Sequence, residues 1–265
     1  GGTERVVIDS NGITMSSGLI NGVGINAIES ESILISNDGG TGTISSALRN
    51  TGFGYEVFDD LTSGDDNTAV GRRALTKVTT GSGNTAMGSG TIELTTTGSN
   101  NTGFGFGALY GNTTASNNTA VGYDCLSVNT TGTQNTAVGA NAANANTTAS
   151  NVTAVGYDAL TDNTTGASNA AFGSFSLENN TTGGSNTACG HNALAGNTTA
   201  SNNTAVGAGA LEVNTTGTAN TAMGVFALDA NTTGSSNTGL GYGTLTAAQT
   251  AENNTAVGRN AGLSV

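Results

Sequence analysis

The pentapeptide Asn-Thr-Ala-Val-Gly at residues 67–71 decides the fold, because it returns every 17 residues. It reappears as Asn-Thr-Ala-Met-Gly at 84–88 and as Asn-Thr-Gly-Phe-Gly at 101–105. The copies start at residues 50, 67, 84, 101, 118, 135, 152, 169, 186, 203, 220, 237 and 254. These 13 copies contain no insertion or deletion, and the last is cut short at Val265. A fixed period of this length is typical of repeat architectures.

Each position of the repeat, counted from 1 at the start of a copy, has its own chemistry. Position 1 is Asn in 12 copies, position 2 is Thr in 12, and position 3 is always Ala or Gly. Position 4 is apolar but varies in size, position 8 is mostly Ala, and position 9 is mostly Leu. Positions 12 to 15 usually read Asn-Thr-Thr-Gly or Asn-Thr-Thr-Ala. Position 5 is glycine in every copy: Gly54, Gly71, Gly88, Gly105, Gly122, Gly139, Gly156, Gly173, Gly190, Gly207, Gly224, Gly241 and Gly258.

The repeat predicts strands rather than helices. Glycine and β-branched residues in the middle of every copy disfavour a helix, at up to ~1 kcal/mol per glycine. Thr-Ala-Val suits a short strand, and Asn-Thr-Thr-Gly suits either a turn or a second short strand. We therefore expect an all-β chain whose residues 50–265 form a parallel β-solenoid, or β-roll, of 13 coils. With stacked strands about 4.8 Å apart, the rod is roughly 60 Å long.

Composition alone would predict disorder. Leu, Ile, Val and Phe make up 48 of 265 residues, about 18%, and the net charge is −12; both values disfavour an ordinary core. A solenoid resolves this conflict because stacked coils need only a thin interior. We expect positions 4 and 9 to form apolar ladders, and position 1 to form an Asn ladder whose side-chain amides bond along the stack.

The orientation of Thr-Ala-Val stays open at the level of sequence. Alternation places positions 2 and 4 on one side of the strand and positions 3 and 5 on the other. Either side can line the coil. The small position 3 indicates close contact with a neighbouring strand or with another chain. A rod so poor in large apolar residues favours an oligomer, and we expect three rods that share an axis.

Charge and hydropathy exclude several classes of partner. No run of ~18 apolar residues is present, so we expect no membrane insertion. No Lys or Arg occurs from Val78 to Gly258, which argues against binding to nucleic acid. The chain begins without Met and shows no signal peptide, so we expect a processed or excised fragment.

Residues 1–49 differ from the repeat and predict a β-rich N-terminal cap or shaft. Eight of the nine isoleucines lie before residue 45. Residues 5–15 predict a hairpin around an Asn-Gly turn, and further turns are expected at 21–22, 37–40 and 41–42. An acidic run then decorates the first coils, either as a solvated negative face or as a divalent-cation site: Glu56, Asp59, Asp60, Asp65 and Asp66.

A search for chemistry yields few candidates. His191 has no triad or metal partner near it in sequence, so we expect an exposed side chain after the glycine bend. Cys125 and Cys189 stand four coils apart, ~19 Å by the stacking distance, so we expect free thiols packed as small apolar groups. No glycine-rich stretch has the lysine spacing of a phosphate loop. We expect no enzyme activity, no catalytic residue, no cofactor and no metal site.

Two surface features allow binding. Position 6 carries a tyrosine row that is either a sugar-contact stripe or a cover for the adjacent coil: Tyr55, Tyr123, Tyr157 and Tyr242. Asn-x-Thr sequons are either glycan acceptors or simply the turn of the repeat: Asn112, Asn129, Asn163, Asn197, Asn214 and Asn231. Ice binding is a distant alternative, because ice-binding solenoids usually need outward Thr two residues apart, whereas positions 13 and 14 are adjacent.

The Asn-Thr-Ala-Val-Gly-x-x-Ala-Leu copies from Asn50 to Val265 resemble repeats of phage tail fibres. They are also similar, more loosely, to the Asn-Ser-Val-Ala-Ile-Gly heads of trimeric autotransporter adhesins. The opening stretch at residues 2–12 looks like a segment common in marine phage tail-fibre proteins. This resemblance implies a homotrimeric β-rod that attaches a virion or a cell to a host surface; the adhesin heads would imply a left-handed roll.

The leading hypothesis is therefore an extracellular rod of a phage tail fibre, on the virion surface, that projects or forms a receptor-binding surface. The expected partners are two further copies of the chain and a glycan or protein receptor on the host. The alternative is a bacterial surface adhesin or extracellular filament subunit. Less directly supported is a polysaccharide-degrading enzyme, because the eight acidic residues after Asp66 are scattered over different repeat positions.

Overall fold

The computed structural model describes residues 46–263 and, before them, strands at 7–9, 12–14, 19–20, 23–28 and 32–36. These residues form strands, turns and bends, without a helix. The first five strands are β1 (Val7–Asp9), β2 (Gly12–Thr14), β3 (Leu19–Ile20), β4 (Val23–Ile28) and β5 (Ser32–Ser36). The repeat supplies β6 (Thr51–Phe53), β7 (Thr68–Val70), β8 (Thr85–Met87), β9 (Thr102–Phe104), β10 (Thr119–Val121), β11 (Thr136–Val138), β12 (Thr153–Val155), β13 (Ala170–Phe172), β14 (Thr187–Cys189), β15 (Thr204–Val206), β16 (Thr221–Met223), β17 (Thr238–Leu240) and β18 (Thr255–Val257).

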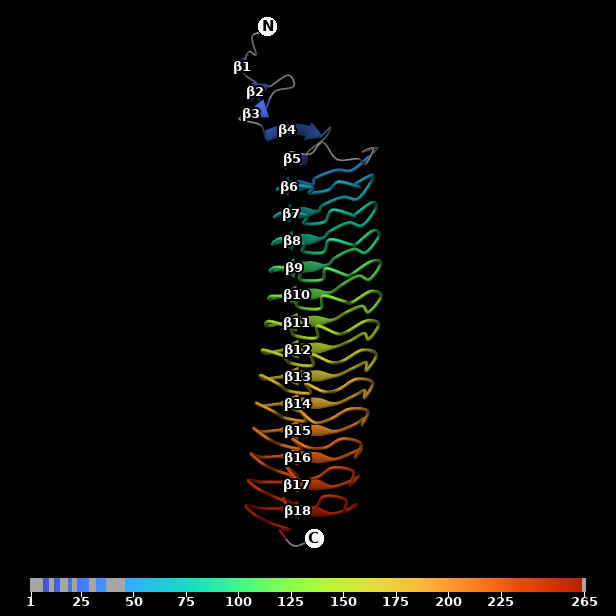
Figure 1. Ribbon diagram of the computed structural model, residues 1–265, viewed down its shortest axis with the longest axis vertical. Coiled ribbons are helices and arrows are strands. Elements are labelled where there is room, and N and C mark those ends of the chain that lie inside the picture. The colour runs from blue at the N-terminus through green and yellow to red at the C-terminus, as the bar shows by residue number, and fades with distance from the viewer. Residues whose placement is uncertain are drawn as a thin grey trace.

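The repeat folds into the predicted parallel β-solenoid. Strands β6 to β18 pair in chain order, each parallel to the next, so that the strands stack as a ladder along the rod (Figure 1). The register is one repeat per coil: Thr68 pairs with Thr85, Ala69 with Ala86, and so on. Each residue therefore stacks on its counterpart from the next copy. The coil closes through turns and bends, so Asn-Thr-Thr-Gly is not a second strand.

The N-terminal strands extend this sheet. Strand β5 pairs in parallel with β6, Ile33 opposite Thr51, and β3 and β4 add antiparallel strands beyond it. Strands β1 and β2 pair antiparallel with Val7 opposite Thr14, which confirms the predicted hairpin, but Gly12 of the expected Asn-Gly turn belongs to β2, opposite Asp9. The turns predicted at 21–22, 37–40 and 41–42 lie outside the described residues.

Three corners of each coil use left-handed backbone. Positions 7, 9 and 17 have positive φ, as at Arg73 (59°), Leu75 (52°) and Asp66 (59°). Such a conformation costs an L-residue roughly 1–2 kcal/mol. Bonds between coils hold it in place: the Arg73 amide donates to the Tyr55 carbonyl at 2.8 Å, and the Leu75 amide donates to the Thr91 carbonyl at 3.2 Å.

The interior is lined by positions 3, 8 and 9. Ala69, Ala74 and Leu75 have no exposed surface, and the same three rows are buried in nearly every coil. The prediction of an apolar ladder at position 9 is confirmed. The apolar ladder predicted at position 4 is also present, but it lies on the outer face of the sheet and not in the interior, because its side chains point outward. In Thr-Ala-Val the alanine therefore points into the coil, and the threonine and valine point outward.

The small size of position 3 has its cause within one chain. A Cβ added to Gly103 would lie 2.5 Å from Thr91 Cγ2 and 3.0 Å from Ile92 Cγ1. These are position 8 and 9 side chains of the preceding coil. At Gly103 even a methyl group would collide, and in the other coils the alanine of position 3 is buried within the same chain, so position 3 is not a seam between chains.

The predicted Asn ladder at position 1 is present, and its asparagines are buried from Asn50 to Asn237, with Val152 the one interruption. The Asn84 backbone amide donates to Asn67 Oδ1 at 2.9 Å, and Asn84 Nδ2 donates to the Gly98 carbonyl at 2.9 Å. The same bonds recur in most coils, for example from Asn118 and Asn203. Each asparagine satisfies buried backbone groups that would otherwise cost ~1–3 kcal/mol each.

Position 12 forms a second buried ladder. Asn129 Nδ2 donates to Asn112 Oδ1 at 3.1 Å and to the Gly132 carbonyl at 2.9 Å. Asparagine stacks in this way from Asn112 to Asn231 without a break. The ladder ends at Ala248, which has no side-chain donor, and Asn231 Oδ1 is buried without a hydrogen-bond partner in the described part of the chain.

The glycine of position 5 permits neighbouring coils to touch. Gly190 has φ +141°, and a Cβ there would lie 2.6 Å from the carbonyl carbon and oxygen of Gly207. The row repeats this contact from Gly54 to Gly241. A side chain at position 5 would collide with backbone, which cannot move aside as a flexible side chain would.

Extending the position 12 ladder should stabilise the rod. In Ala248→Asn, the new Nδ2 can donate to Asn231 Oδ1 and to the Ala251 carbonyl. We expect a gain of about 1 kcal/mol, measured as a rise of about 2–4 °C in the thermal midpoint. Asn163→Ala, in the middle of the ladder, should lower the midpoint because it leaves partners on both sides unpaired; a lower midpoint for Ala248→Asn would contradict the ladder.

Gly190→Ala should destabilise the solenoid by more than about 2 kcal/mol, because both the backbone angle and the carbonyl of Gly207 oppose a side chain. The matched control is Gly184→Ala, at position 16, where another coil already carries Ala167. Thermal unfolding followed by circular dichroism compares the two. Equal midpoints for the two variants would show that position 5 tolerates a side chain.

Candidate binding surfaces

The outer face of the sheet carries an apolar row. We call the position 4 residues the outer sheet row: Phe53, Val70, Met87, Phe104, Val121, Val138, Val155, Phe172, Cys189, Val206, Met223, Leu240 and Val257. Nine of them are large hydrophobic side chains with 37–65% of their surface exposed. Soluble monomers rarely expose contiguous apolar patches of more than a few hundred Å². A row that runs along about 60 Å of rod is a candidate contact surface.

The same face carries no charge. Positions 1 to 5 contain no Asp, Glu, Lys or Arg in any copy. The threonines of position 2 flank the outer sheet row, partly exposed on the same side of the strands. The outer face is therefore a neutral strip on a chain of net charge −12.

The four predicted tyrosines lie on one line but do not form one site. Tyr55, Tyr123, Tyr157 and Tyr242 are 39–55% exposed and belong to coils 1, 5, 7 and 12. Each contacts the adjacent coil: Tyr123 stacks on Phe106 with ring centres 5.6 Å apart, and Tyr157 meets the Phe175 ring edge-on. Arg72 and Arg259 lie over the rings of Tyr55 and Tyr242. These contacts fit the interpretation that the tyrosines cover neighbouring coils.

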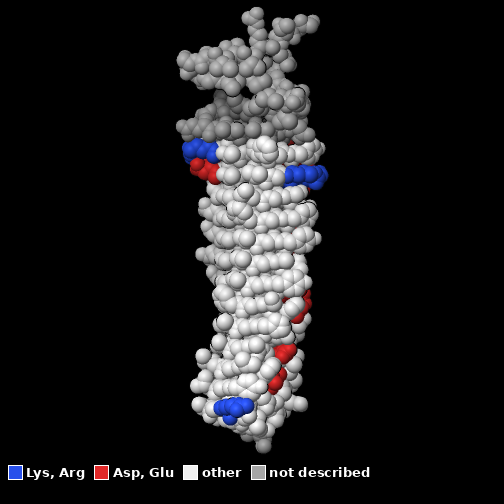
Figure 2. Space-filling model, turned by 90° about the vertical axis from the view of Figure 1, so that its left-hand side faces the viewer, with Lys and Arg blue, Asp and Glu red and all other residues white. Residues whose placement is uncertain are grey.

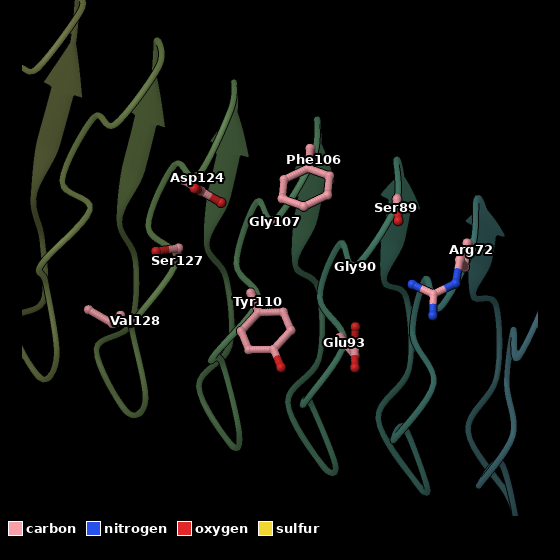
Figure 3. Close-up of a pocket in the computed structure, with 10 residues that line it drawn as sticks. All are labelled: Arg72, Ser89, Gly90, Glu93, Phe106, Gly107, Tyr110, Asp124, Ser127 and Val128. Atoms are coloured by element: carbon pink, nitrogen blue, oxygen red, sulfur yellow. The ribbon is translucent and has the colours of Figure 1, made fainter.

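Sequence reasoning missed a hollow beside this row. Its lining includes two aromatic rings, two carboxylates and a guanidinium group that come from four successive coils (Figure 3). The lining residues are Arg72, Ser89, Gly90, Glu93, Phe106, Gly107, Tyr110, Asp124, Ser127 and Val128. Tyr110 was overlooked because it lies at position 10, outside the tyrosine row. The signal that could have found it is the pair of glycines at position 7, Gly90 and Gly107.

The acidic run of the first coils is largely neutralised by basic side chains. Arg49 pairs with Asp66 at 2.6 Å, Arg73 with Glu56 at 2.5 Å, and Lys77 with Asp60 at 3.1 Å. Asp65 instead accepts the Leu48 amide. On the face shown in Figure 2, charged side chains gather towards the ends of the described rod and are sparse between them. Among the described residues, no group of three His, Cys, Asp or Glu side chains is placed to hold a metal ion.

These pairs shift the ionisation of their members. The hydrogen bond from Arg49 holds the pKa of Asp66 below its ordinary value. The pKa of Glu56 is also lowered, first by a hydrogen bond with Tyr55 and then by Arg73. In contrast, burial raises the pKa of Asp229, whose Oδ1 has no hydrogen-bond partner within the described residues.

The single histidine and the two cysteines lie apart from one another. His191 is exposed, as predicted, with its ring edge-on to Phe175 at 5.8 Å between centres. Both cysteines are free thiols. Cys125 is buried at position 8, where burial raises its pKa to about 12. Cys189 is exposed in the outer sheet row, so the expectation that it packs as a buried apolar group is wrong.

The Asn-x-Thr sequons are part of the interior. Asn112, Asn129, Asn163, Asn197, Asn214 and Asn231 have no exposed surface. Their Nδ2 atoms, which would carry a glycan, donate hydrogen bonds within the position 12 ladder. In the folded rod these sequons serve as the turn of the repeat.

Comparison with known proteins adds no relative to this description: no family model, curated protein sequence or solved structure matches the chain. In the part that the structure describes, no helix could span a membrane.

Three candidate surfaces result from the geometry described above: the outer sheet row, the tyrosine row and the hollow beside the tyrosine row.

The buried thiol should be inert. In Cys189→Ser, which leaves Cys125 alone, we expect no reaction with Ellman's reagent at pH 9, because a pKa of about 12 leaves almost no thiolate. Unfolding in guanidinium should release one reactive thiol per chain. Rapid modification of the folded variant at pH 9 would contradict the burial of position 8.

Proposed function

We propose that this chain is the rod segment of an extracellular attachment fibre, with a phage tail fibre as the leading case and a bacterial surface adhesin as the alternative. The observation that carries the proposal is the outer sheet row, an exposed, charge-free apolar strip along an unbroken stack of coils. The proposed location is the virion surface, or the bacterial cell surface in the alternative case.

The coil geometry suits mechanical projection. Backbone bonds join each coil to the next at several points, such as Thr68 to Asn84 and Gly88 to Val70, both at 2.8 Å. The two Asn ladders add buried side-chain bonds in parallel with them. A chain so connected resists bending, because bending must lengthen several of these bonds at once. This stiffness supports a role that holds a tip or a side surface away from the particle.

The partner that best fits the outer sheet row is a second copy of the same chain. Copies of a protein with net charge −12 repel one another over most of their surface, whereas this neutral strip allows close approach. Parallel rods would also place identical rows against one another, since every row has the same spacing. Closed symmetric oligomers are the usual outcome for identical subunits, and we propose three rods around one axis.

Ice binding gains one supporting observation. The Thr of position 2 and the residue of position 4 both face outward, two residues apart, on consecutive parallel strands. However, position 4 ranges from Val121 to Phe172 and Cys189, so the surface is uneven. Ice binding therefore remains the distant alternative, and it requires a monomer with a free outer face.

The test is the mass of the folded protein in solution, by light scattering. One chain has a mass of 25.8 kDa, and we expect three times that value. The double variant Val121→Lys, Val138→Lys should be a folded monomer, because its charges would be buried against neighbouring rods. The matched control is Thr131→Lys, Thr148→Lys, which alters exposed position 14 residues of the same two coils and should remain a trimer.

A second readout tests the alignment of the rods. Cys189 lies in the outer sheet row, so parallel rods in register would bring its copies together near the axis. A short bismaleimide crosslinker should then join pairs of chains in the wild type but not in Cys189→Ser. A folded wild-type monomer would overturn the proposed assembly, and an oligomer without the crosslink would overturn the parallel register.

A further inference from the structure

The hollow between coils exists because one row of side chains is interrupted twice in succession. Position 7 carries a side chain in the first two coils, Glu56 and Arg73, and again in the five coils from Asp124 to Asn192; further along, Gly209 and Gly243 interrupt it only singly. Coils 3 and 4 have Gly90 and Gly107 instead, both at left-handed φ near 66°. Asn141 adopts a similar φ of 56° at the same position, so the backbone does not require glycine here. The effect of Gly90 and Gly107 is therefore to leave out two side chains, not to relieve backbone strain.

Polar and aromatic side chains line the space beside Gly90 and Gly107. Above Gly90, an ideal Cβ would lie 3.4 Å from Glu93 Oε2 and 3.7 Å from Tyr110 Cδ2. Above Gly107, the Asp124 carboxylate oxygen occupies the place that a Cβ would take. Phe106 and Tyr110 extend from the same coil on either side of Gly107 (Figure 3). The resulting cavity has a volume of about 310 Å³.

Neighbouring groups hold several of the walls from behind. The Arg72 guanidinium carbon lies 5.9 Å from the centre of the Tyr55 ring, and Phe106 stacks on Tyr123. Glu93 Oε1 lies 3.7 Å from Arg73 Nη1, and its side chain is only 12% exposed. A site whose groups are already supported loses less side-chain entropy when it binds a ligand.

We propose that this Gly90–Gly107 pocket binds a single neutral pyranose ring. The aromatic faces of Phe106 and Tyr110, 56% and 42% exposed, suit the apolar C–H face of a sugar. The carboxylates of Glu93 and Asp124 accept hydrogen bonds from hydroxyl pairs, and the Arg72 guanidinium donates to ring or hydroxyl oxygens. The inference deepens the proposed attachment role, because such a ring would be a residue of a host-surface glycan.

Size and charge narrow the ligand class. Ligand pockets of drug-sized molecules span about 300–1,000 Å³, so this cavity accommodates one ring and leaves the rest of a glycan in solvent. The pocket lining carries two carboxylates, Glu93 and Asp124, and one guanidinium group, Arg72. This excess of negative charge disfavours the binding of phosphates and acidic sugars. A purely apolar ligand would cover the three charged groups and exclude water from them without offering a hydrogen bond in return. Affinity at one site should be weak, and several sites on one fibre would multiply it.

The test is saturation-transfer NMR on the full chain with methyl glycosides of glucose, galactose and mannose as probes. We expect at least one probe to receive saturation in the millimolar range. Gly107→Asn should reduce this binding at least tenfold, because its side chain would displace the Asp124 carboxylate that lies above Gly107. It can also bond to Asp124 as Asn141 Nδ2 does to Asp158 at 2.9 Å. Tyr110→Ala should do the same by removing an aromatic wall.

Two controls locate the site. Gly243→Asn changes a position 7 glycine with a similar φ of 58° outside the pocket, and Tyr242→Ala removes a member of the tyrosine row. Both should bind the probes as the wild type does, with all variants checked for unchanged melting temperature. Absence of saturation for every probe overturns the inference, and so does full binding by Gly107→Asn and Tyr110→Ala. Loss of binding in Tyr242→Ala would move the sugar contact to the tyrosine row and also overturn it.

The result of the glycoside-binding experiment is independent of the result of the mass measurement that tests the proposed trimeric rod. A trimer that binds none of the three glycosides overturns the pocket and leaves the proposed rod intact. A monomer that binds them through the pocket overturns the proposed assembly and leaves the saccharide site intact.

Discussion

The registered parallel pairing of one coil with the next is the constraint on which the other features depend. Because the period is 17 residues without exception, every side chain lies about 4.8 Å from a copy of its own position. A residue type therefore suits a position only if it can stack on a residue of the same type in the next coil. Asparagine does so inside the rod because its side chain both donates and accepts hydrogen bonds. Glycine does so at position 5 because backbone meets backbone there.

The same constraint organises charge. A buried row of identical carboxylates would repel itself, so the interior rows are apolar or Asn. Where charges occur on the surface, opposite signs follow one another in successive coils, as in Glu56 and Arg73 at position 7 or Asp60 and Lys77 at position 11. Beyond these coils two acidic residues do follow one another at position 10, and there burial, followed by the charge of Glu212, raises the pKa of Asp229. The scarcity of charge along the rod is thus a consequence of stacking.

Sequence alone was sufficient for the period, the strands, the leucine row and the position 1 ladder, because each follows from identity at a fixed spacing. It was insufficient for the facing of Thr-Ala-Val, since alternation is satisfied by both orientations. Position 4 nevertheless carried a usable signal: its volume varies from Val70 to Phe172, which a close-packed interior tolerates poorly. The left-handed corner at Leu75 was also hidden, because leucine has no preference for that conformation. The pocket was hardest to foresee, as it arises from side chains that two coils lack.

The unbroken period has a consequence for how such a rod can change in length. Removing or duplicating any 17 residues between coils restores the same neighbours above and below, so rod length varies in steps of about 4.8 Å with no loss of internal bonding. A surface feature that depends on one or two coils, such as the absence of a side chain at position 7, would keep its structure and only shift along the rod when 17 residues are removed or duplicated elsewhere. The length of the rod and the place of such a surface feature along it can therefore be adjusted independently.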